Sequence, residues 1–147
     1  MTGKELSFLL DGIYAAPTTA MGRGVFTKAA IAAGTYVEFA PVIVLSAAER
    51  ELIDQTLLHD YIFEWGKKQE QCVVALGLVS VYNHSYDANC AYEMYFKKGV
   101  IAIKTVKPVK RGGELFINYN GTPDDEKRVW FETADANPHP NGSSGQA

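Results

Sequence analysis

The chain has 147 residues, of which 47% are hydrophobic and 21% are charged, and its formal net charge is -3. This length fits one domain with a genuine core, and the mildly acidic balance argues against direct binding of nucleic acid, which needs a basic surface. No run of about eighteen apolar residues is present, so we expect no membrane-spanning helix.

The first quarter of the chain predicts short strands. Residues 13–15 form a predicted strand that ends at Ala16-Pro17, and a second strand follows Gly22-Arg23-Gly24. Residues 31–34 predict a turn. Residues 35–45 are mostly apolar but contain Pro41, which leaves open two short strands or one bent strand.

A capping box opens the predicted helix. Ser46 can accept a hydrogen bond from the third helical N–H, and Glu49 can reach back to the N-cap. Apolar residues then continue at helical spacing, which predicts a helix to about His59. These apolar residues are Leu52, Ile53, Leu57 and Leu58.

Two hairpins and a last strand complete the predicted elements. The hairpins are residues 61–65 with 72–76, and residues 91–96 with 100–105. Residues 78–82 predict a helical turn, residues 115–119 a strand, and residues 124–131 a helix. Short strands with frequent turns predict a mostly β fold.

The two ends of the chain and the cysteines carry further expectations. We expect a folded domain over residues 1–133 and a disordered tail over 134–147, which has no apolar pattern. The N-terminus lacks a signal-peptide pattern. Cys72 and Cys90 form no C-x-x-C pair, so we expect no metal, and two free thiols rather than a disulfide.

Four short motifs follow one another along the chain. A polar Asn-His-Ser turn is costly to bury without partners, so the third of them is not ordinary core sequence. Each motif alone is weak, since Gly-x-Gly is widespread. The motifs are Gly22-Arg23-Gly24-Val25-Phe26, Glu38-Phe39, Asn83-His84-Ser85 with Asn89-Cys90, and Gly112-x-Glu114-Leu115-x-x-x-Tyr119.

In this order and spacing, the motifs make the chain resemble the SET-domain family of protein lysine methyltransferases, over about residues 13–130. The resemblance implies a SET domain: β-clip-like, with short curled sheets, few helices and a C-terminal pseudoknot. It also implies methyl transfer from S-adenosyl-L-methionine to a lysine of a histone or another basic protein. Such an in-line displacement needs a neutral amine and a dry passage, so catalysis is mostly positioning and electrostatics.

The resemblance also assigns residues to the cofactor. By it, the backbone of Gly22, Arg23 and Gly24 contacts the methionine part, which suits glycines without a Cβ. Asn83 and His84 are similar to residues that fix the amino and adenine ends. Trp130 is similar in placement to an aromatic that covers the adenine. The structural alternatives are a turn, a local cap and a packing residue.

The catalytic assignments centre on Tyr119. By resemblance its hydroxyl orients the amine, lines the methyl channel and contacts the cofactor; the alternative is a core tyrosine bonded to the backbone. Tyr92 is assigned with it as catalytic. Phe39, Tyr92 and Ile117 match substrate-channel positions, where aromatic walls suit an alkyl stem that carries a cation.

Several positions depart from the usual family pattern. Gly113 stands where a second acidic residue is usual, Asn118 where aspartate is usual, and Phe39 where tyrosine is frequent. Tyr86 and Ala88 replace the usual cysteine and proline, and no cysteine-rich zinc segment follows the domain. The departures motivate a second hypothesis, a weak or inactive SET-fold module that still binds cofactor or peptide.

Several properties stay open at this stage. They are which lysine is the substrate, how many methyl groups are transferred, and whether the chain forms a homodimer. The chain is expected inside the cell, in the cytoplasm or the nucleus, while delivery to another cell is open too.

Overall fold

The structure is a computed structural model, and it describes residues 6–66 and 70–119. Short strands dominate, as predicted. In chain order the elements are β1 (Phe8–Leu9), β2 (Ile13–Pro17), β3 (Arg23–Thr27), β4 (Tyr36–Leu45), α1 (Ala47–Ile53), η1 (Leu57–Tyr61), β5 (Ile62–Trp65), β6 (Gln71–Ala75), η2 (Val79–Val81), β7 (Asn83–His84), β8 (Cys90–Tyr95), β9 (Val100–Thr105) and β10 (Glu114–Ile117). The predicted helix at 124–131, Trp130 and the tail at 134–147 lie outside the described residues.

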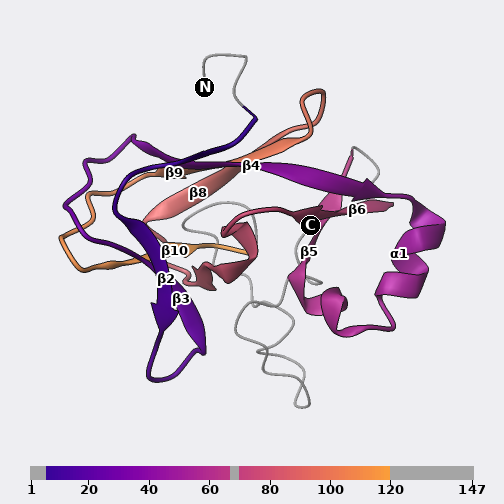
Figure 1. Cartoon of the computed structure of the whole chain (residues 1–147), viewed down its shortest axis with the longest axis horizontal. Coiled ribbons are helices and arrows are strands. Elements are labelled where there is room, and N and C mark those ends of the chain that lie inside the picture. The colour runs from indigo at the N-terminus through magenta and orange to yellow at the C-terminus, as the bar shows by residue number, and fades with distance from the viewer. Residues whose placement is uncertain (1–5, 67–69, 120–147) are drawn as a thin grey trace.

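The strands form two sheets (Figure 1). The larger has the order β5-β6-β4-β9-β8, with β1 also paired to β4, and the smaller has the order β2-β3-β10-β7. β4 is one continuous strand, which settles the alternative that Pro41 left open. Residues 36–41 of β4 pair with β9 and residues 42–45 pair with β6, so Pro41 lies where the pairing changes partner.

The helical region confirms the predicted start and corrects the predicted end. Ser46 Oγ accepts from the Glu49 N–H, and Glu49 Oε1 accepts from the Ser46 N–H, so the capping box is present. α1 ends at Ile53, and the prediction of a helix to His59 was wrong. Leu52 and Leu57 are 67% and 68% exposed, so the helical spacing there did not mark a buried face. Thr56 caps a separate 3₁₀ helix, η1.

The remaining predicted elements are confirmed with small shifts at their ends. β5 with β6 and β8 with β9 are the two hairpins. The helical turn is η2. The last strand, β10, ends at Ile117, two residues before Tyr119. Among the described residues, no helix is long and apolar enough to cross a membrane.

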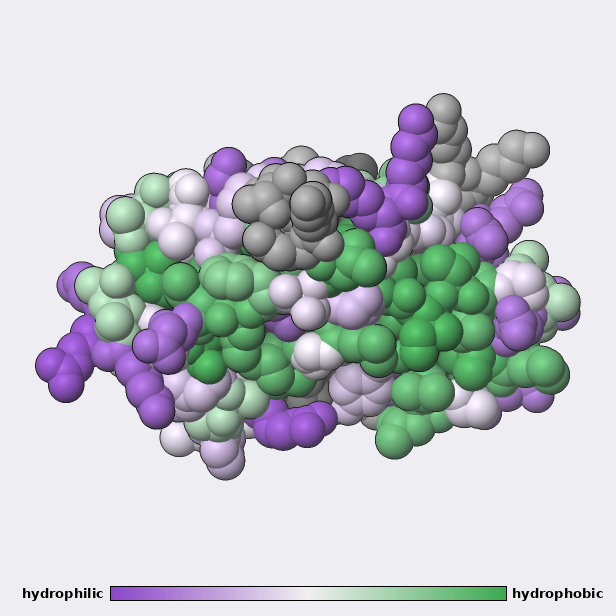
Figure 2. Space-filling model, turned by 45° about the horizontal axis from the view of Figure 1, so that its top comes forward, coloured by the Kyte–Doolittle hydropathy of each residue, from purple (hydrophilic) through white to green (hydrophobic). Residues whose placement is uncertain are grey.

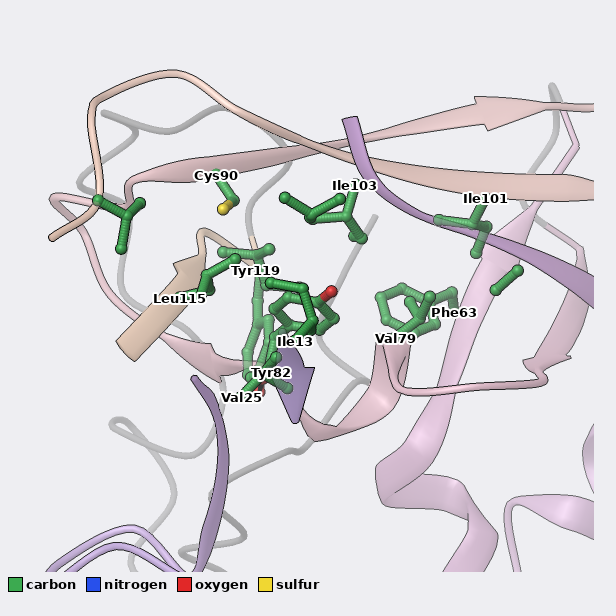
Figure 3. Packing of buried hydrophobic residues seen from close by; sticks show 14 of the residues in the cluster. Ile13, Val25, Phe63, Val79, Tyr82, Cys90, Ile101, Ile103, Leu115 and Tyr119 are labelled. Carbon is green, nitrogen blue, oxygen red and sulfur yellow. Dashed lines mark hydrogen bonds between the residues drawn. The ribbon is translucent and has the colours of Figure 1, made fainter. Parts of the chain in front are cut away.

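The core lies between the two sheets. Figure 3 shows Tyr82 and Tyr119 among its apolar side chains, near Leu115. Cys72 and Cys90 are free, as the sequence predicts, and the structure shows both to be fully buried. Apolar side chains also gather on the outer face shown in Figure 2. The exposed large apolar residues of β1 and β4 are Phe8, Leu9, Ile43 and Val44.

Asn89 fixes the strand that leads to Tyr119. Its Nδ2 donates to the Glu114 carbonyl at 2.9 Å, and its Oδ1 accepts from the Phe116 N–H at 2.8 Å. One side chain therefore satisfies a backbone acceptor and a backbone donor of β10.

We expect Asn89→Ala to lower the free energy of unfolding by about 2 kcal/mol, because two backbone groups of β10 lose their partner. Chemical denaturation measures this loss. Asp87→Ala is the control in the same loop: it removes an exposed ion pair with Lys107 and should cost under about 1 kcal/mol. Equal effects of the two substitutions would contradict the role of Asn89.

Candidate functional site

The two halves of the sequence signature meet in a parallel strand pair. β7 pairs with β10, with Phe116 opposite Asn83 and Ile117 opposite His84. The Ser85 N–H continues the pairing by donating to the Ile117 carbonyl at 3.0 Å. The Asn-His-Ser turn therefore lies beside the segment that ends at Tyr119.

Asn83 joins this pair to the glycine motif. Its Nδ2 donates to the Arg23 carbonyl at 3.0 Å and to Glu114 Oε2 at 2.8 Å. A Cβ on Gly24 would overlap Glu114 Oε2 and lie 3.0 Å from Asn83 Nδ2. Gly24 is therefore needed for this close packing, and Arg23 contributes its carbonyl oxygen.

The other amide atom of Asn83 is available to a ligand. Asn83 is fully buried, and among the described residues its Oδ1 has no hydrogen-bond partner. A buried acceptor without a donor costs free energy. The position therefore suits a ligand that brings an N–H group, such as an amine.

His84 acts here as an acceptor. Its Nδ1 accepts from the Tyr119 N–H at 3.1 Å, which requires the neutral ring with its proton on Nε2. Burial lowers the pKa of His84 to about 4, so the ring is neutral at physiological pH. Its centroid lies 5.1 Å from that of Tyr119. His84 thus helps to fix the backbone and ring of Tyr119.

Tyr119 is 2% exposed and its hydroxyl donates to the Tyr82 carbonyl at 2.7 Å. Burial raises the pKa of Tyr119 well above its usual value, and the nearby Tyr61 raises it further. The side chain is therefore a neutral phenol. Its one hydrogen is given to the Tyr82 carbonyl, so toward any other group the oxygen can act only as an acceptor.

The predicted channel residues divide between two clusters. Ile117 is fully buried in the same core cluster as Tyr119, and Tyr92 packs against that cluster with its ring 5.8 Å from Phe63. Burial, and then the charge of Glu64, raise the pKa of Tyr92 to about 12. Phe39 belongs to a separate cluster with Val100 and Ala102. The structure brings Tyr92 and Ile117 to the cluster of Tyr119 but does not bring Phe39 there.

The sequence motif did not predict the burial and the hydrogen bonds of Glu38. Glu38 is 2% exposed; its Oε1 accepts from the Tyr82 hydroxyl at 2.9 Å and its Oε2 from the Leu78 N–H at 2.7 Å. Burial raises the pKa of Glu38 to about 7. The available signal was an acidic residue inside an apolar strand, because glutamate is rarely buried without partners. Glu114 and Tyr82 were likewise not predicted as site residues.

The chain matches the SET domain over residues 22–120. It belongs to the SET-domain family of protein lysine methyltransferases. A curated relative, the "Histone-lysine N-methyltransferase, H3 lysine-37 specific" of Schizosaccharomyces pombe, is 33% identical over 116 residues, which cover 78% of this chain and 74% of the relative. The predicted family and fold are thus confirmed.

Solved structures share the SET-domain fold. A putative histone methyltransferase of Plasmodium falciparum aligns with a TM-score of 0.61 and 22% identity, over 78% of this chain and 97% of that one. The ctPRC2 complex of Chaetomium thermophilum, in an autoinhibited conformation bound to S-adenosylmethionine, aligns with a TM-score of 0.61 and 24% identity. That alignment covers 74% of this SET domain protein but 15% of the ctPRC2 chain.

The buried carboxyl of Glu38 makes a prediction about stability. The pKa of Glu38 is about 7 in the fold and 4.5 ordinarily, so the folded state binds more protons between these values. Its stabilising contribution is complete below about pH 4.5 and is lost as the pH rises through about 7. We expect the free energy of unfolding of the wild type, relative to Glu38→Gln, to fall by about 3 kcal/mol across this range.

The comparison with Glu38→Gln is essential because His84 acts in the opposite sense. Its pKa is lowered to about 4, so its contribution to stability is lost as the pH falls below about 6.5. His84 is common to both proteins and cancels in the difference. Denaturant unfolding at a series of pH values measures the two curves, and parallel curves would contradict the buried, protonated Glu38.

Proposed function

We propose that the chain transfers a methyl group from S-adenosyl-L-methionine to a lysine side chain of a histone or another basic protein. The observation that carries the proposal is the β7–β10 pairing. It places the Arg23 carbonyl, Asn83, His84 and Tyr119 together, in a chain that belongs to a lysine methyltransferase family.

The residues that would hold the cofactor fit its chemistry. SET domains use S-adenosylmethionine, and the cofactor supplies a methyl group on a sulfonium sulfur. The unpartnered Asn83 Oδ1 suits the cofactor's amino group as a hydrogen-bond donor. The backbone from Gly22 to Gly24 would line the same end, and His84 the adenine end. Trp130, proposed as an adenine cover, lies outside the described residues.

Tyr119 would orient the acceptor lysine. Because its hydrogen is donated to the Tyr82 carbonyl, its oxygen can accept an N–H of the neutral amine. That contact would aim the amine lone pair at the methyl carbon, which is a positioning effect. Tyr92 and Ile117 would form walls for the lysine stem. The proposal leaves Phe39 out of this channel, because it belongs to the other cluster.

A histone is the favoured substrate class. The relative from Schizosaccharomyces pombe carries "H3 lysine-37 specific" in its name. The net charge of -3 also suits a basic protein substrate. A histone substrate would place the protein in the nucleus.

We expect Tyr119→Phe to lower kcat by at least about 30-fold, equivalent to about 2 kcal/mol, while cofactor affinity changes little. The phenol oxygen would act on the reacting amine and not on the bound cofactor. Mass spectrometry of histone H3 incubated with S-adenosylmethionine measures turnover, and calorimetry measures affinity. Tyr36→Phe is the matched control, because its hydroxyl bonds Glu93 elsewhere.

The same assay separates the two functions that the sequence allows. Cofactor binding by the wild type without methylation of any histone would contradict the proposal and favour the binding module. Equal losses of turnover and affinity in Tyr119→Phe would indicate a structural tyrosine.

We expect Asn83→Ala to weaken cofactor binding by about 1–3 kcal/mol, because the donor on the cofactor loses its acceptor. Asp87→Ala is the control: it removes an exposed side chain from the same polar segment, and its ion pair is with Lys107 and not with β7 or β10. Calorimetry on folded samples of both variants measures the dissociation constants. An equal effect of the two substitutions would remove Asn83 from the cofactor site.

A further inference from the structure

The buried carboxyl of Glu38 is connected to Tyr119 through one intervening residue, Tyr82, which forms a hydrogen bond with each of them. Glu38 accepts from the Tyr82 hydroxyl at 2.9 Å, and the Tyr82 carbonyl accepts from the Tyr119 hydroxyl at 2.7 Å. All three side chains are at most 2% exposed. Tyr82 is thus held at its ring by Glu38 and contacts Tyr119 with its backbone.

The surroundings of Glu38 show that this contact is built into the fold. The Leu78 N–H donates to its second oxygen at 2.7 Å. A Cβ on Gly77 would overlap that oxygen, and Gly77 has a φ of +88°, which disfavours other residues there. Within the described part of the chain, no lysine or arginine forms an ion pair with Glu38. The carboxyl therefore acts as the hydrogen-bond acceptor for the Leu78 N–H and the Tyr82 hydroxyl.

We propose that Glu38 is a positioning residue for methyl transfer, which fixes Tyr82 so that the Tyr82 carbonyl orients the Tyr119 hydroxyl. The inference rests on the proposed function. It assigns a role to Glu38, which belongs to one of the four motifs but received no role from the resemblance, through its contact with the tyrosine directly before Asn83.

The proton on Glu38 decides how well Tyr82 is held. An ionised carboxylate accepts from both the Leu78 N–H and the Tyr82 hydroxyl. A protonated carboxyl must donate through one oxygen. The Leu78 N–H cannot accept, so the Tyr82 hydroxyl would have to turn and accept instead. The ionised form therefore gives Tyr82 the more defined position.

The buried Glu38 borders a pocket of the molecule. Glu38 lines a cavity of about 660 Å³ between β1, β2, β4 and residues 76–78. The titratable groups near the carboxyl and Tyr82 include Tyr14 on β2, which lines the same pocket, Cys90 on β8, and Tyr119, which donates to the Tyr82 carbonyl. Since burial brings the pKa of Glu38 to about 7, its ionisation changes in the neutral range.

The test compares Glu38→Gln, Tyr82→Phe and the double variant, each with S-adenosylmethionine and histone H3. Glu93→Gln is the matched control: Glu93 also accepts from two tyrosines, Tyr36 and Tyr95, but it has no bond to Tyr82. Steady-state kinetics over a series of pH values give kcat and KM, and circular dichroism confirms that each variant is folded.

We expect each single variant to lose about tenfold in kcat, with both KM values within about twofold, and the double variant to lose no more than either, because the two residues act as one unit. The ratio of wild-type kcat to Glu38→Gln kcat should rise between about pH 6 and pH 8, as Glu38 ionises. The control should retain the wild-type kcat. If Glu38 and Tyr82 had only a structural role, their substitution would lower thermal stability without lowering kcat selectively at nearly constant KM.

Every other outcome overturns either the inference about Glu38 alone or the proposed function as well. Normal kcat in folded Glu38→Gln, or losses that add in the double variant, would overturn the inference while leaving the proposed function intact. A wild type without turnover would overturn the proposed function and the inference with it. If Glu38→Gln does not fold, Tyr82→Phe carries the test, because it keeps the buried ring, the carbonyl and Glu38. Normal kcat there would overturn the inference.

Discussion

The site depends on a short parallel contact between β7 and β10. A two-residue strand has little stability of its own, and parallel strands need a long crossover between them. Here the β8–β9 hairpin lies within that crossover. Side chains fix the contact: Asn83 bonds Glu114, Asn89 bonds one carbonyl and one N–H of the β10 backbone, and His84 accepts from the Tyr119 N–H. Together with the strand pairing, these bonds join the glycine motif, the Asn-His-Ser turn and Tyr119.

The departures from the family pattern look different once the packing is known. At Gly113, a Cβ would lie 2.9 Å from the Lys110 carbonyl oxygen, so a second acidic residue would not fit this turn without a shift. Glu114 alone supplies the carboxylate that Asn83 requires. The turn thus keeps its link to the glycine motif with one acid. This favours an intact site over a decayed one.

The sequence predicted those features that depend on local signals. The capping box at Ser46, the two hairpins and the order of the motifs all follow from neighbouring residues. Which side chains of β4 point to the core could not be predicted from alternation along the strand, because the pairing with β9 shifts its register between Tyr36 and Glu38. At this irregularity, Glu38 faces Tyr82, while the next residue, Phe39, belongs to the separate cluster with Val100 and Ala102. The hydrogen-bond partners of Glu38 lie 40 and 44 residues further along the chain, so the sequence shows an acid in an apolar strand but not the groups that this acid contacts.

A complex with S-adenosylhomocysteine and a lysine peptide tests the central claim most directly. A crystal structure of it should show the cofactor amino group within hydrogen-bond distance of Asn83 Oδ1. The Tyr119 hydroxyl should lie within hydrogen-bond distance of the lysine amine, beside the line that joins the sulfur to the amine nitrogen, and should still be bonded to the Tyr82 carbonyl. A cofactor bound away from Asn83, or a lysine that enters on the Phe39 side of β4, would contradict the account.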